Sequence, residues 1–212
     1  MVFSKKNKNF QDLNFNNLLT ISKIFYKIEH FICYGTLLGI TRDKNIIKGD
    51  DDVDFLINYK NKNKVLKKMK SFKSFKLNKK VTNKFFLQFI KTDQGLKTFV
   101  DFYFYINNTN KNYIIEKHNF LSNIKNPKFA IHIPKKIIFP IKKDKNLKII
   151  SIPNKPKELC KFLYGDSWKT PLKKNFGYRM EIVNHKPLLI KRSYAGTLTR
   201  QFKKKFNNFI KS

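Results

Sequence analysis

The chain has 212 residues, of which 41% are hydrophobic, and this suits one domain with a sizeable core. Its 46 lysines and arginines against 14 aspartates and glutamates give a formal net charge of +32, which favours polyanionic partners such as nucleic acids, anionic lipid headgroups, acidic glycans or nucleotides. Two isolated cysteines and the lack of any apolar run near 20 residues exclude a disulfide-rich secreted protein and a membrane-spanning one.

The charge has a second explanation at this stage. Lysines are spread over the whole chain, so a coding bias toward Lys, Asn, Ile and Phe accounts for them as well as a polyanion-binding face does. The first ten residues, MVFSKKNKNF, lack the apolar stretch of a secretory signal. We therefore expect a soluble cytoplasmic protein whose basic face could also lie against the anionic inner face of a membrane. The sequence leaves the oligomeric state open.

Hydrophobic periodicity predicts helices and strands in turn along the first two thirds of the chain. The expected helices cover residues 10–30, 37–42 and 61–72, and the expected strands cover residues 31–34, 53–57, 75–77, 85–90, 98–106 and 113–116. Prolines divide the last third into short pieces, and Pro156 suits the first turn of a helix over residues 157–164.

The chain shows no internal repeat and no clear linker. We expect a single domain over residues 1–212, with a core of about 10–175 and a basic C-terminal extension over 176–212. The tail from Lys203 onward is expected to be frayed or to form a surface helix.

Four of the scarce acidic residues stand within five positions, Asp50–Asp52 and Asp54. Residues two apart on a strand share a face, so Asp52 and Asp54 are expected to point the same way, with Val53 turned toward the core. Neighbouring carboxylates repel each other unless a cation lies between them, and Mg²⁺ binds carboxylates together with phosphate oxygens and water. This pattern favours a magnesium site, with Mn²⁺ as the alternative ion.

A further carboxylate lies in the most strand-like stretch of the chain, TFVDFYFYI (98–106), which has Asp101 as its single charge. Such a residue is costly to bury unless it is paired or metal-bound. If the two strands are neighbours, Asp101 completes a three-carboxylate metal site. The simpler alternatives are a solvated acidic turn or a calcium loop for Asp50–Asp54, and a solvent-facing strand residue for Asp101. The acidic stretch lacks the alternating ligands and closing glutamate of an EF-hand loop.

The segment before the acidic stretch, Tyr34–Gly39 (YGTLLG), joins an expected strand to an expected helix. Gly35 allows the backbone to approach an anion closely, and N–H groups at a helix start can bind a phosphate together with the Thr36 hydroxyl. Arg42 offers a guanidinium to a second phosphate or to a nearby aspartate. A phosphate-binding turn close to twin carboxylates indicates a metal–nucleotide site.

The run YGTLLGITR…IIKGDDDVDF resembles the signature of the LicD/fukutin-related phosphotransferase family, in which Gly-Thr-Leu-Leu-Gly and an arginine precede an aspartate-rich stretch ending in Asp-x-Asp. The segment 99–102 (FVDF) is similar to the family's third, strand-borne aspartate. The segment 163–171 (LYGDSWKTP) is similar to a tyrosine–glycine…proline segment near the end of that domain. These matches run in the family's order from residue 34 to residue 171. In one departure, Lys48-Gly49 stand where the family usually has Pro-Trp.

The resemblance implies an α/β (α+β) fold with a nucleotidyltransferase-like mixed sheet flanked by helices, spanning the single expected domain. It also implies a transferase that moves a phosphocholine-like or polyol-phosphate-like group from a CDP-linked donor to a glycan acceptor, in the synthesis of cell-surface polysaccharide or glycoconjugate. Nucleic acid is then not expected as a partner.

For this chemistry we hypothesise that Asp52 and Asp54 hold Mg²⁺ against the donor diphosphate. Asp101 would complete a second metal site, about 4 Å from the first, or take the proton of the acceptor hydroxyl. The diphosphate would be held by Gly35, Thr36 and Arg42. Asp50 and Asp51 are either partners of Arg42 or surface residues.

Two residues of the third match, Tyr164 and Gly165, are expected to shape the donor or acceptor pocket together with Trp168. The alternative is a packing motif in which Gly165 ends a helix and Trp168 is buried.

Two other functions fit the sequence. One is a nucleotidyltransferase on the same core, which would add a nucleotide from an NTP to a small molecule, a protein or RNA and would release pyrophosphate where the first reaction releases CMP. The other is a non-catalytic basic protein that binds nucleic acid, with some of its 22 Phe and 9 Tyr stacked on bases. Most of those Phe lie in apolar runs typical of a core.

Overall fold

A computed structural model describes residues 9–93, 95–117, 129–171 and 178–191 of the chain. These residues form a seven-stranded mixed sheet, surrounding helices and two small two-stranded sheets, so the predicted α/β fold class is confirmed. The strands of the large sheet are β1 (His30–Ile32), β2 (Asp52–Asn58), β3 (Lys76–Leu77), β4 (Phe86–Asp93), β5 (Leu96–Asn107), β6 (Tyr113–Glu116) and β7 (Ile131–Pro134).

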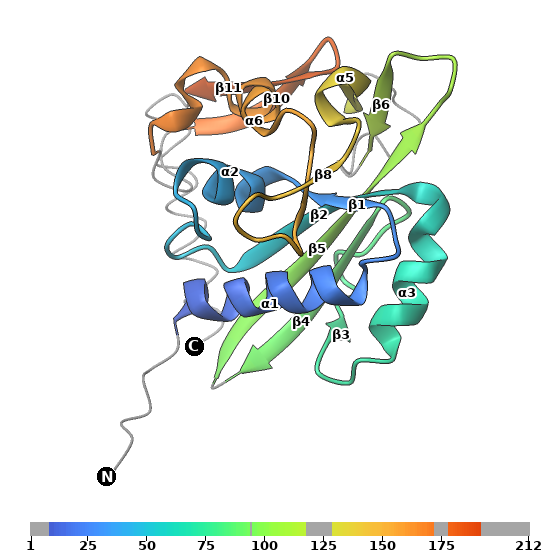
Figure 1. The fold of residues 1–212 in the computed structure, drawn as a ribbon, viewed down its shortest axis with the longest axis vertical. Helices are drawn as coiled ribbons and strands as arrows, with labels where there is room; N and C mark the ends of the chain where they lie inside the picture. Colours follow the sequence, from blue (N-terminus) through green and yellow to red (C-terminus); the bar gives the residue numbers. More distant parts are fainter. Residues whose placement is uncertain (1–8, 94, 118–128, 172–177, 192–212) are drawn as a thin grey trace.

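The remaining elements lie around this sheet (Figure 1). The helices are α1 (Phe10–Ile24), α2 (Tyr34–Arg42), α3 (Lys62–Lys70), α5 (Lys135–Ile138) and α6 (Pro156–Tyr164), with the 3-10 turns η1 (Tyr59–Asn61) and η3 (Asp166–Lys169). The small sheets consist of β8 (Lys142–Lys143) with β9 (Ser151–Ile152), and of β10 (Tyr178–Val183) with β11 (Lys186–Lys191). In the described part of the chain, every helix falls short of the length and apolar character that a bilayer crossing requires.

The sheet has the strand order β1-β2-β5-β4-β3, and β6 joins β5 to β7. β2 and β5 run parallel to each other, while the other pairs of this sheet are antiparallel. A parallel pair needs a crossover connection. Here the crossover consists of η1, α3, β3 and β4, and it returns the chain so that β5 lies beside β2.

The two faces of the central strands are covered by different helices. Phe55 of β2 and Phe102 of β5 are register partners, and their rings stack with centroids 5.7 Å apart. Phe25, directly after α1, meets Phe102 edge-on at 5.4 Å, so α1 covers this face, which it crosses in Figure 1. Neighbouring residues on a strand point to opposite faces, so Asp54 and Asp101 lie on the other face. On that side α2 packs on β2 and against α6.

The core is built largely from aromatic rings. The largest fully buried side chains include Tyr105, Phe25, Phe31, Phe55, Phe89, Phe102 and Phe104. Burying a ring of this kind stabilises a fold by about 1.5–3 kcal/mol. The many phenylalanines therefore serve the core, as their place in apolar runs predicts.

Most predicted elements are present with shifted bounds, but the first helix and strand differ. The helix predicted over residues 10–30 ends at Ile24, and the strand predicted over 31–34 covers His30–Ile32. Tyr34 is not in that strand, because it is the first residue of α2. The helix predicted over 157–164 is present as α6 and begins one residue earlier, at Pro156.

The hairpin β10–β11 was not predicted from the sequence. It lies within the segment expected to be a basic extension, and it packs against α6 and β7. The pairing of Val183 with Lys186 closes a turn of two residues, Asn184 and His185, which both have positive φ (48° and 61°). The predicted tail from Lys203 lies outside the described residues.

Candidate active site

Strand register brings three aspartates of the sequence prediction together. Asp54 of β2 is the register partner of Asp101 of β5, and Asp52 lies on the same face two residues before Asp54. One carboxylate oxygen from each of the three lies within 4.8 Å of the others. The parallel pairing therefore converts residues far apart in the chain into one acidic cluster.

The cluster is largely removed from solvent. Asp54 is 3% exposed and Asp101 is 4% exposed. Burial, followed by the charge of Asp52, raises the pKa of Asp54 well above its ordinary value. Burial also raises the pKa of Asp101 to about 7, and hydrogen bonds from Gln88 and Tyr103 oppose that shift. Ionised carboxylates crowded in this way are unfavourable without a compensating positive charge.

A second acidic group adjoins the first and shares Asp52 with it. Oxygens of Asp50, Asp51 and Asp52 also lie within 4.8 Å of one another, and Asp50 is only 6% exposed. All the donors of both groups are carboxylate oxygens, the donor type that hard divalent cations such as Mg²⁺ prefer. The acidic residues therefore fit a metal ion.

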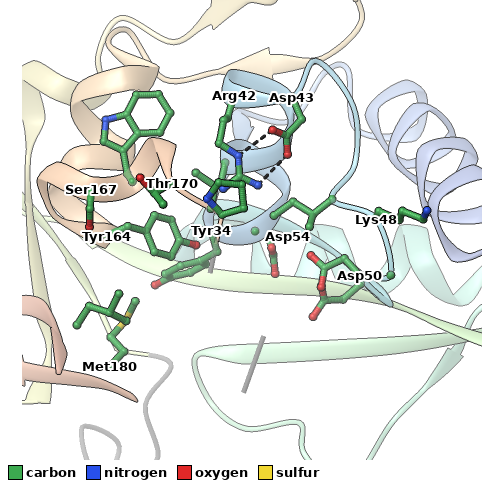
Figure 2. A pocket seen from close by; sticks show the side chains of 18 of the residues that line it. Tyr34, Arg42, Asp43, Lys48, Asp50, Asp54, Tyr164, Ser167, Thr170 and Met180 are labelled. Carbon is green, nitrogen blue, oxygen red and sulfur yellow. Dashed lines mark hydrogen bonds and ion pairs between the residues drawn. The ribbon is translucent and has the colours of Figure 1, made fainter. Parts of the chain in front are cut away.

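A cavity of about 800 Å³ opens beside the acidic residues, lined by residues of α2, α6 and the β10–β11 hairpin. In the view of Figure 2 the carboxylates of Asp50 and Asp54 lie at one end, Met180 lies at the other, and the rings of Tyr34 and Tyr164 lie between them. The lining also includes Asp52, Tyr103, Leu38, Trp168 and Leu189. A cavity with an acidic end, aromatic and apolar side chains and a few further polar side chains in its walls, Arg42 among them, suits a small molecule that has a charged, cation-binding part.

The comparison with protein families decides the classification. A family model for the nucleotidyltransferase domain of LicD/FKTN/FKRP matches residues 27–154. The chain belongs to this family. No curated protein matches the chain. The part matched as a LicD-family domain runs from the turn before β1 to the segment before α6 and contains all three clustered aspartates. Membership indicates a transferase.

The Gly-Thr pair of the LicD signature contacts the protein's own carboxylates. A Cβ on Gly35 would lie 2.9 Å from Oδ2 of Asp50 and 3.4 Å from Oδ2 of Asp54. Thr36 donates its backbone N–H to Oδ2 of Asp54 (3.1 Å), and its hydroxyl accepts the N–H of Asp54 (2.7 Å). Gly35 thus leaves room for the carboxylates of Asp50 and Asp54, and its expected contact with a phosphate stays a prediction. Thr36 is 1% exposed, so its observed contacts position Asp54 and do not reach the cavity.

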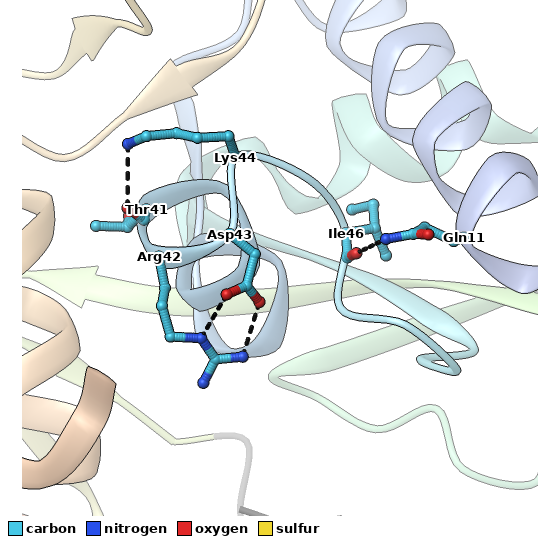
Figure 3. Close-up of polar contacts among 6 residues, drawn as sticks. All are labelled: Gln11, Thr41, Arg42, Asp43, Lys44 and Ile46. Carbon is cyan, nitrogen blue, oxygen red and sulfur yellow. Dashed lines mark hydrogen bonds and ion pairs between the residues drawn. The ribbon is translucent and has the colours of Figure 1, made fainter. Parts of the chain in front are cut away.

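Arg42, the arginine of the LicD signature, lines the cavity and is paired with the next residue. Its Nε and Nη2 each donate to the Asp43 carboxylate at 2.8 Å (Figure 3). This ion pair lowers the pKa of Asp43. The sequence analysis considered Asp50 or Asp51 as the partner of Arg42, and the structure gives this place to Asp43. The pair uses Nε and one hydrogen of Nη2, so the two hydrogens of Nη1 and the second hydrogen of Nη2 are not used by Asp43.

In segment 163–171, the third match to the LicD pattern, some residues line the cavity and others serve packing. Tyr164 and Trp168 line the cavity, and Trp168 is 8% exposed. Burial and the charge of Asp54 raise the pKa of Tyr164, so its hydroxyl stays protonated. Gly165 follows α6 with φ 79°, and its N–H bonds to the Lys161 carbonyl at 2.8 Å. Gly165 is therefore placed as in the packing alternative, and Tyr164 as in the pocket interpretation.

Sequence reasoning missed a set of side chains around Tyr34. This residue has a positive φ of 44°, a conformation that costs a residue with a side chain about 1 kcal/mol or more. Its hydroxyl donates to Glu116 at 3.0 Å, and its ring centroid lies 4.6 Å from that of Tyr103. Glu116 is 1% exposed. In the sequence, Tyr34 is the first residue of the YGTLLG segment and Glu116 ends a short predicted strand. Nothing in these two positions indicates that the side chains meet.

Proposed function

We propose that the chain is a Mg²⁺-dependent transferase, with Mn²⁺ as the alternative ion, that moves a phosphocholine-like or polyol-phosphate-like group from a CDP-linked donor to a glycan acceptor. The observation that carries this proposal is the convergence of Asp52, Asp54 and Asp101 beside a cavity large enough for a nucleotide-linked molecule. Membership in the LicD family supports transfer of this type in glycan modification.

The proposed reaction is a displacement at phosphorus. An acceptor hydroxyl oxygen forms a bond to the distal phosphorus of the donor, the bond from that phosphorus to the bridging oxygen breaks, and CMP leaves. Divalent cations, when bound, would neutralise the charge on the donor diphosphate and on the leaving oxygen. The remaining requirement is positioning, which the chain's own residues supply.

Each carboxylate has a defined place in this proposal. Asp52 and Asp54 hold the cations at the cavity, and the N–H and hydroxyl of Thr36 fix the orientation of Asp54. Asp101 is the register partner of Asp54 and accepts a 3.0 Å bond from Gln88 Nε2. It either completes the cation site or takes the proton of the acceptor hydroxyl, for which a pKa of about 7 is suitable.

The cavity wall supplies binding for the rest of the donor. Arg42, oriented by Asp43, directs a guanidinium edge at a phosphate oxygen. Tyr34, Tyr103 and Tyr164 offer aromatic faces to the less polar part of the ligand. The acceptor glycan would approach from the open side of the cavity.

The decisive experiment measures CMP release from a panel of CDP-linked alcohols, with Mg²⁺ and with a chelator, alongside pyrophosphate release from NTPs. We expect Mg²⁺-dependent CMP release from at least one member of the panel in the presence of acceptor. We also expect Asp52→Asn and Asp54→Asn to reduce turnover at least 100-fold, because charge stabilisation at the transferred group is lost. Near-normal turnover of either variant would contradict the assignment, and pyrophosphate release would favour nucleotidyl transfer.

A second prediction concerns stability with and without metal. Asp52→Asn removes a charge that disfavours ionised Asp54, so we expect the melting temperature of the metal-free protein to rise by about 2–4 °C, as for roughly 1 kcal/mol. The wild-type protein should gain stability with Mg²⁺, and the variant should lose this gain. Differential scanning fluorimetry with a Mg²⁺ titration measures both effects. Glu158→Gln removes an exposed charge on α6 and serves as the control that leaves the Mg²⁺ response unchanged.

A further inference from the structure

Two buried amides on α1 are unexplained by the packing of that helix. Asn14 is 0% exposed and Asn17 is 1% exposed, and they share the buried face of α1 with Leu13, Leu18 and Ile21. An amide in such a place is costly unless it is hydrogen-bonded, so the bonds that these side chains make show what they hold.

The two amides have different partners. Asn14 Nδ2 donates to the backbone carbonyl of Asp50 at 2.9 Å. Asn17 Nδ2 donates to Thr98 Oγ1 on β5 at 2.9 Å, and Asn17 Oδ1 accepts from Lys91 Nζ on β4 at 3.0 Å. A longer contact of 3.4 Å joins Asn17 Nδ2 to Asn14 Oδ1. Asn17 therefore ties α1 to the sheet, whereas Asn14 ties α1 to the acidic segment.

A third amide of α1 holds the same loop at an earlier point. Gln11 Nε2 donates to the carbonyl of Ile46 at 2.5 Å, as Figure 3 shows. Residues 43–51 form no helix or strand between α2 and β2. The loop is also held at its end, where the N–H of Phe99 donates to the Asp51 carbonyl at 2.8 Å. The backbone of this loop is thus fixed by donors from α1 and β5.

The chemistry of these donors matters for a cation site. The carboxylates of Asp50, Asp51 and Asp52 have oxygens within 4.8 Å of one another, so their repulsion tends to spread the loop. A lysine or arginine could hold the loop by pairing with a carboxylate, but it would also compete with a metal ion. A neutral amide bonded to the main-chain carbonyl of Asp50 fixes the backbone without itself pairing with a carboxylate.

We propose that Asn14 is a positioning residue that holds the acidic segment Asp50–Asp52 in the geometry that binds a divalent cation, and that Gln11 supports it at the other end of the loop. This inference rests on the proposed metal dependence of the chain. It adds a part of the site that lies on α1, outside the residues 27–154 matched by the family model.

The test compares Asn14→Leu with Asn17→Leu, in which leucine keeps a similar size on an apolar helix face. Mn²⁺ binding is measured by electron paramagnetic resonance on the full chain without donor or acceptor, and thermal unfolding is followed in parallel. Each variant leaves one or more sheet or loop groups without a buried partner, so we expect both melting temperatures to fall by about 5 °C. We expect Asn14→Leu to weaken Mn²⁺ binding at least 10-fold and Asn17→Leu to change it by less than about threefold.

The outcomes separate this inference from the function on which it rests. If wild-type protein binds Mn²⁺ and Asp52→Asn abolishes binding, the metal site stands; equal effects of the two leucine variants on affinity would then overturn the role of Asn14 alone. If the wild-type protein binds no Mn²⁺, both proposals fall. Should Asn14→Leu fail to fold, Gln11→Ala is the second variant, because Gln11 lies near the surface. It is expected to weaken Mn²⁺ binding about threefold or more, and unchanged binding would count against the proposal.

Discussion

At the scale of single residues, His30 shows how burial creates a dependence on pH. Its side chain is 2% exposed, Nδ1 lies 2.7 Å from the Ile28 carbonyl, and Nε2 has no hydrogen-bond partner among the described residues. Nδ1 therefore carries the proton, and Nε2 faces a core in which Phe25 and Phe55 meet the ring edge-on. Protonation of Nε2 would place a charge in this core, so burial lowers the pKa of His30.

We predict that acid weakens the fold through His30. Because folding lowers this pKa, the unfolded chain binds the proton more tightly, so the contribution to stability is complete above the ordinary value of 6.5 and is lost as pH falls below it. His30 should contribute a decrease in the free energy of unfolding of up to about 1.4 kcal/mol per pH unit in that range. The raised pKa values of Asp54 and Asp101 contribute in the opposite direction, so the His30 contribution is the difference between the wild-type protein and a variant without this histidine. Urea denaturation between pH 7.5 and 5 measures the slope for the wild-type protein and for His30→Phe, and the two slopes should differ by the His30 contribution. An unchanged slope in the variant would assign the acid sensitivity to other groups.

Site residues were predictable from the sequence where a single pattern determines the direction of a side chain. Strand alternation placed Asp52 and Asp54 on one face, and the cost of a buried charge singled out Asp101. The amide of Asn14 and the bond from Tyr34 to Glu116 could not be predicted, because each depends on a tertiary contact between segments that are distant in the sequence. Arg42 was expected to meet a phosphate or a nearby aspartate, with Asp50 or Asp51 as the candidates, and in the structure it pairs with its own neighbour, Asp43.

At the scale of elements, the loop that follows α2 explains why the helix has a glycine at position 39. Gly39 lies in α2, where a glycine normally weakens a helix by about 1 kcal/mol relative to alanine. A Cβ at this position would lie 2.5 Å from the carbonyl oxygen of Asn45 and 3.0 Å from the N–H nitrogen of Ile47. The loop backbone therefore packs directly against the helix backbone at Gly39.

We predict that Gly39→Ala destabilises the protein by about 2–3 kcal/mol, despite the higher helix propensity of alanine, because the contacted atoms are backbone atoms that cannot rotate away. Displacement of the loop should also weaken Mn²⁺ binding. Gly95→Ala is the control: its φ of 79° is unfavourable for alanine, but its Cβ would have open space, so only about 1 kcal/mol is expected. Chemical denaturation compares the two, and equal losses would show that the packing at Gly39 is not critical.

The misplaced end of the first helix has a physical cause. Phe25 and Ile28 continue the helical spacing of apolar residues, and both are buried, with exposures of 0% and 7%. The helix nevertheless ends at Ile24, and beyond it the N–H of Phe25 donates to the Ile21 carbonyl and the N–H of Tyr26 donates to the Lys23 carbonyl. The spacing of apolar residues in this segment indicates which side chains are buried. A turn can bury side chains as a helix does, so the spacing does not determine where the helix ends. The hairpin β10–β11 was missed for a related reason. Two-residue hairpin turns prefer pairs such as Asn-Gly, and the Asn184-His185 turn contains only the first residue of such a pair.

At the scale of the whole molecule, the charge is unevenly distributed along the chain. Residues 55–92 contain no aspartate or glutamate and twelve lysines. Four of these lysines form an exposed lysine face on α3, on the opposite side of that helix from the buried Val65 and Met69. Phe72, just beyond α3, is 37% exposed. The expected contact with an anionic membrane surface stays a prediction, and the lysine face is where it can be tested; its members are Lys64, Lys67, Lys68 and Lys70.

We predict that the protein binds vesicles containing phosphatidylserine in a salt-sensitive manner, because lysines near such a surface each contribute about 1 kcal/mol. Replacing the four lysines of the lysine face by glutamine should weaken sedimentation with these vesicles at least 10-fold. The matched control changes four exposed lysines elsewhere, Lys136, Lys142, Lys145 and Lys148, and should weaken it far less. Equal losses would mean that the overall charge acts without a preferred face, as the coding-bias interpretation expects.

The parallel pairing of β2 with β5 makes the acidic pocket a product of long-range folding. Asp54 belongs to the strand before the crossover and Asp101 to the strand after it. The chain on either side of the crossover therefore lacks at least one of the three clustered aspartates. A fragment that stops before β5 would lack Asp101 and therefore the complete cluster of Asp52, Asp54 and Asp101, however well its helices formed. Capture of a divalent ion would then report, during refolding, the moment at which the two halves of the sheet have come into register.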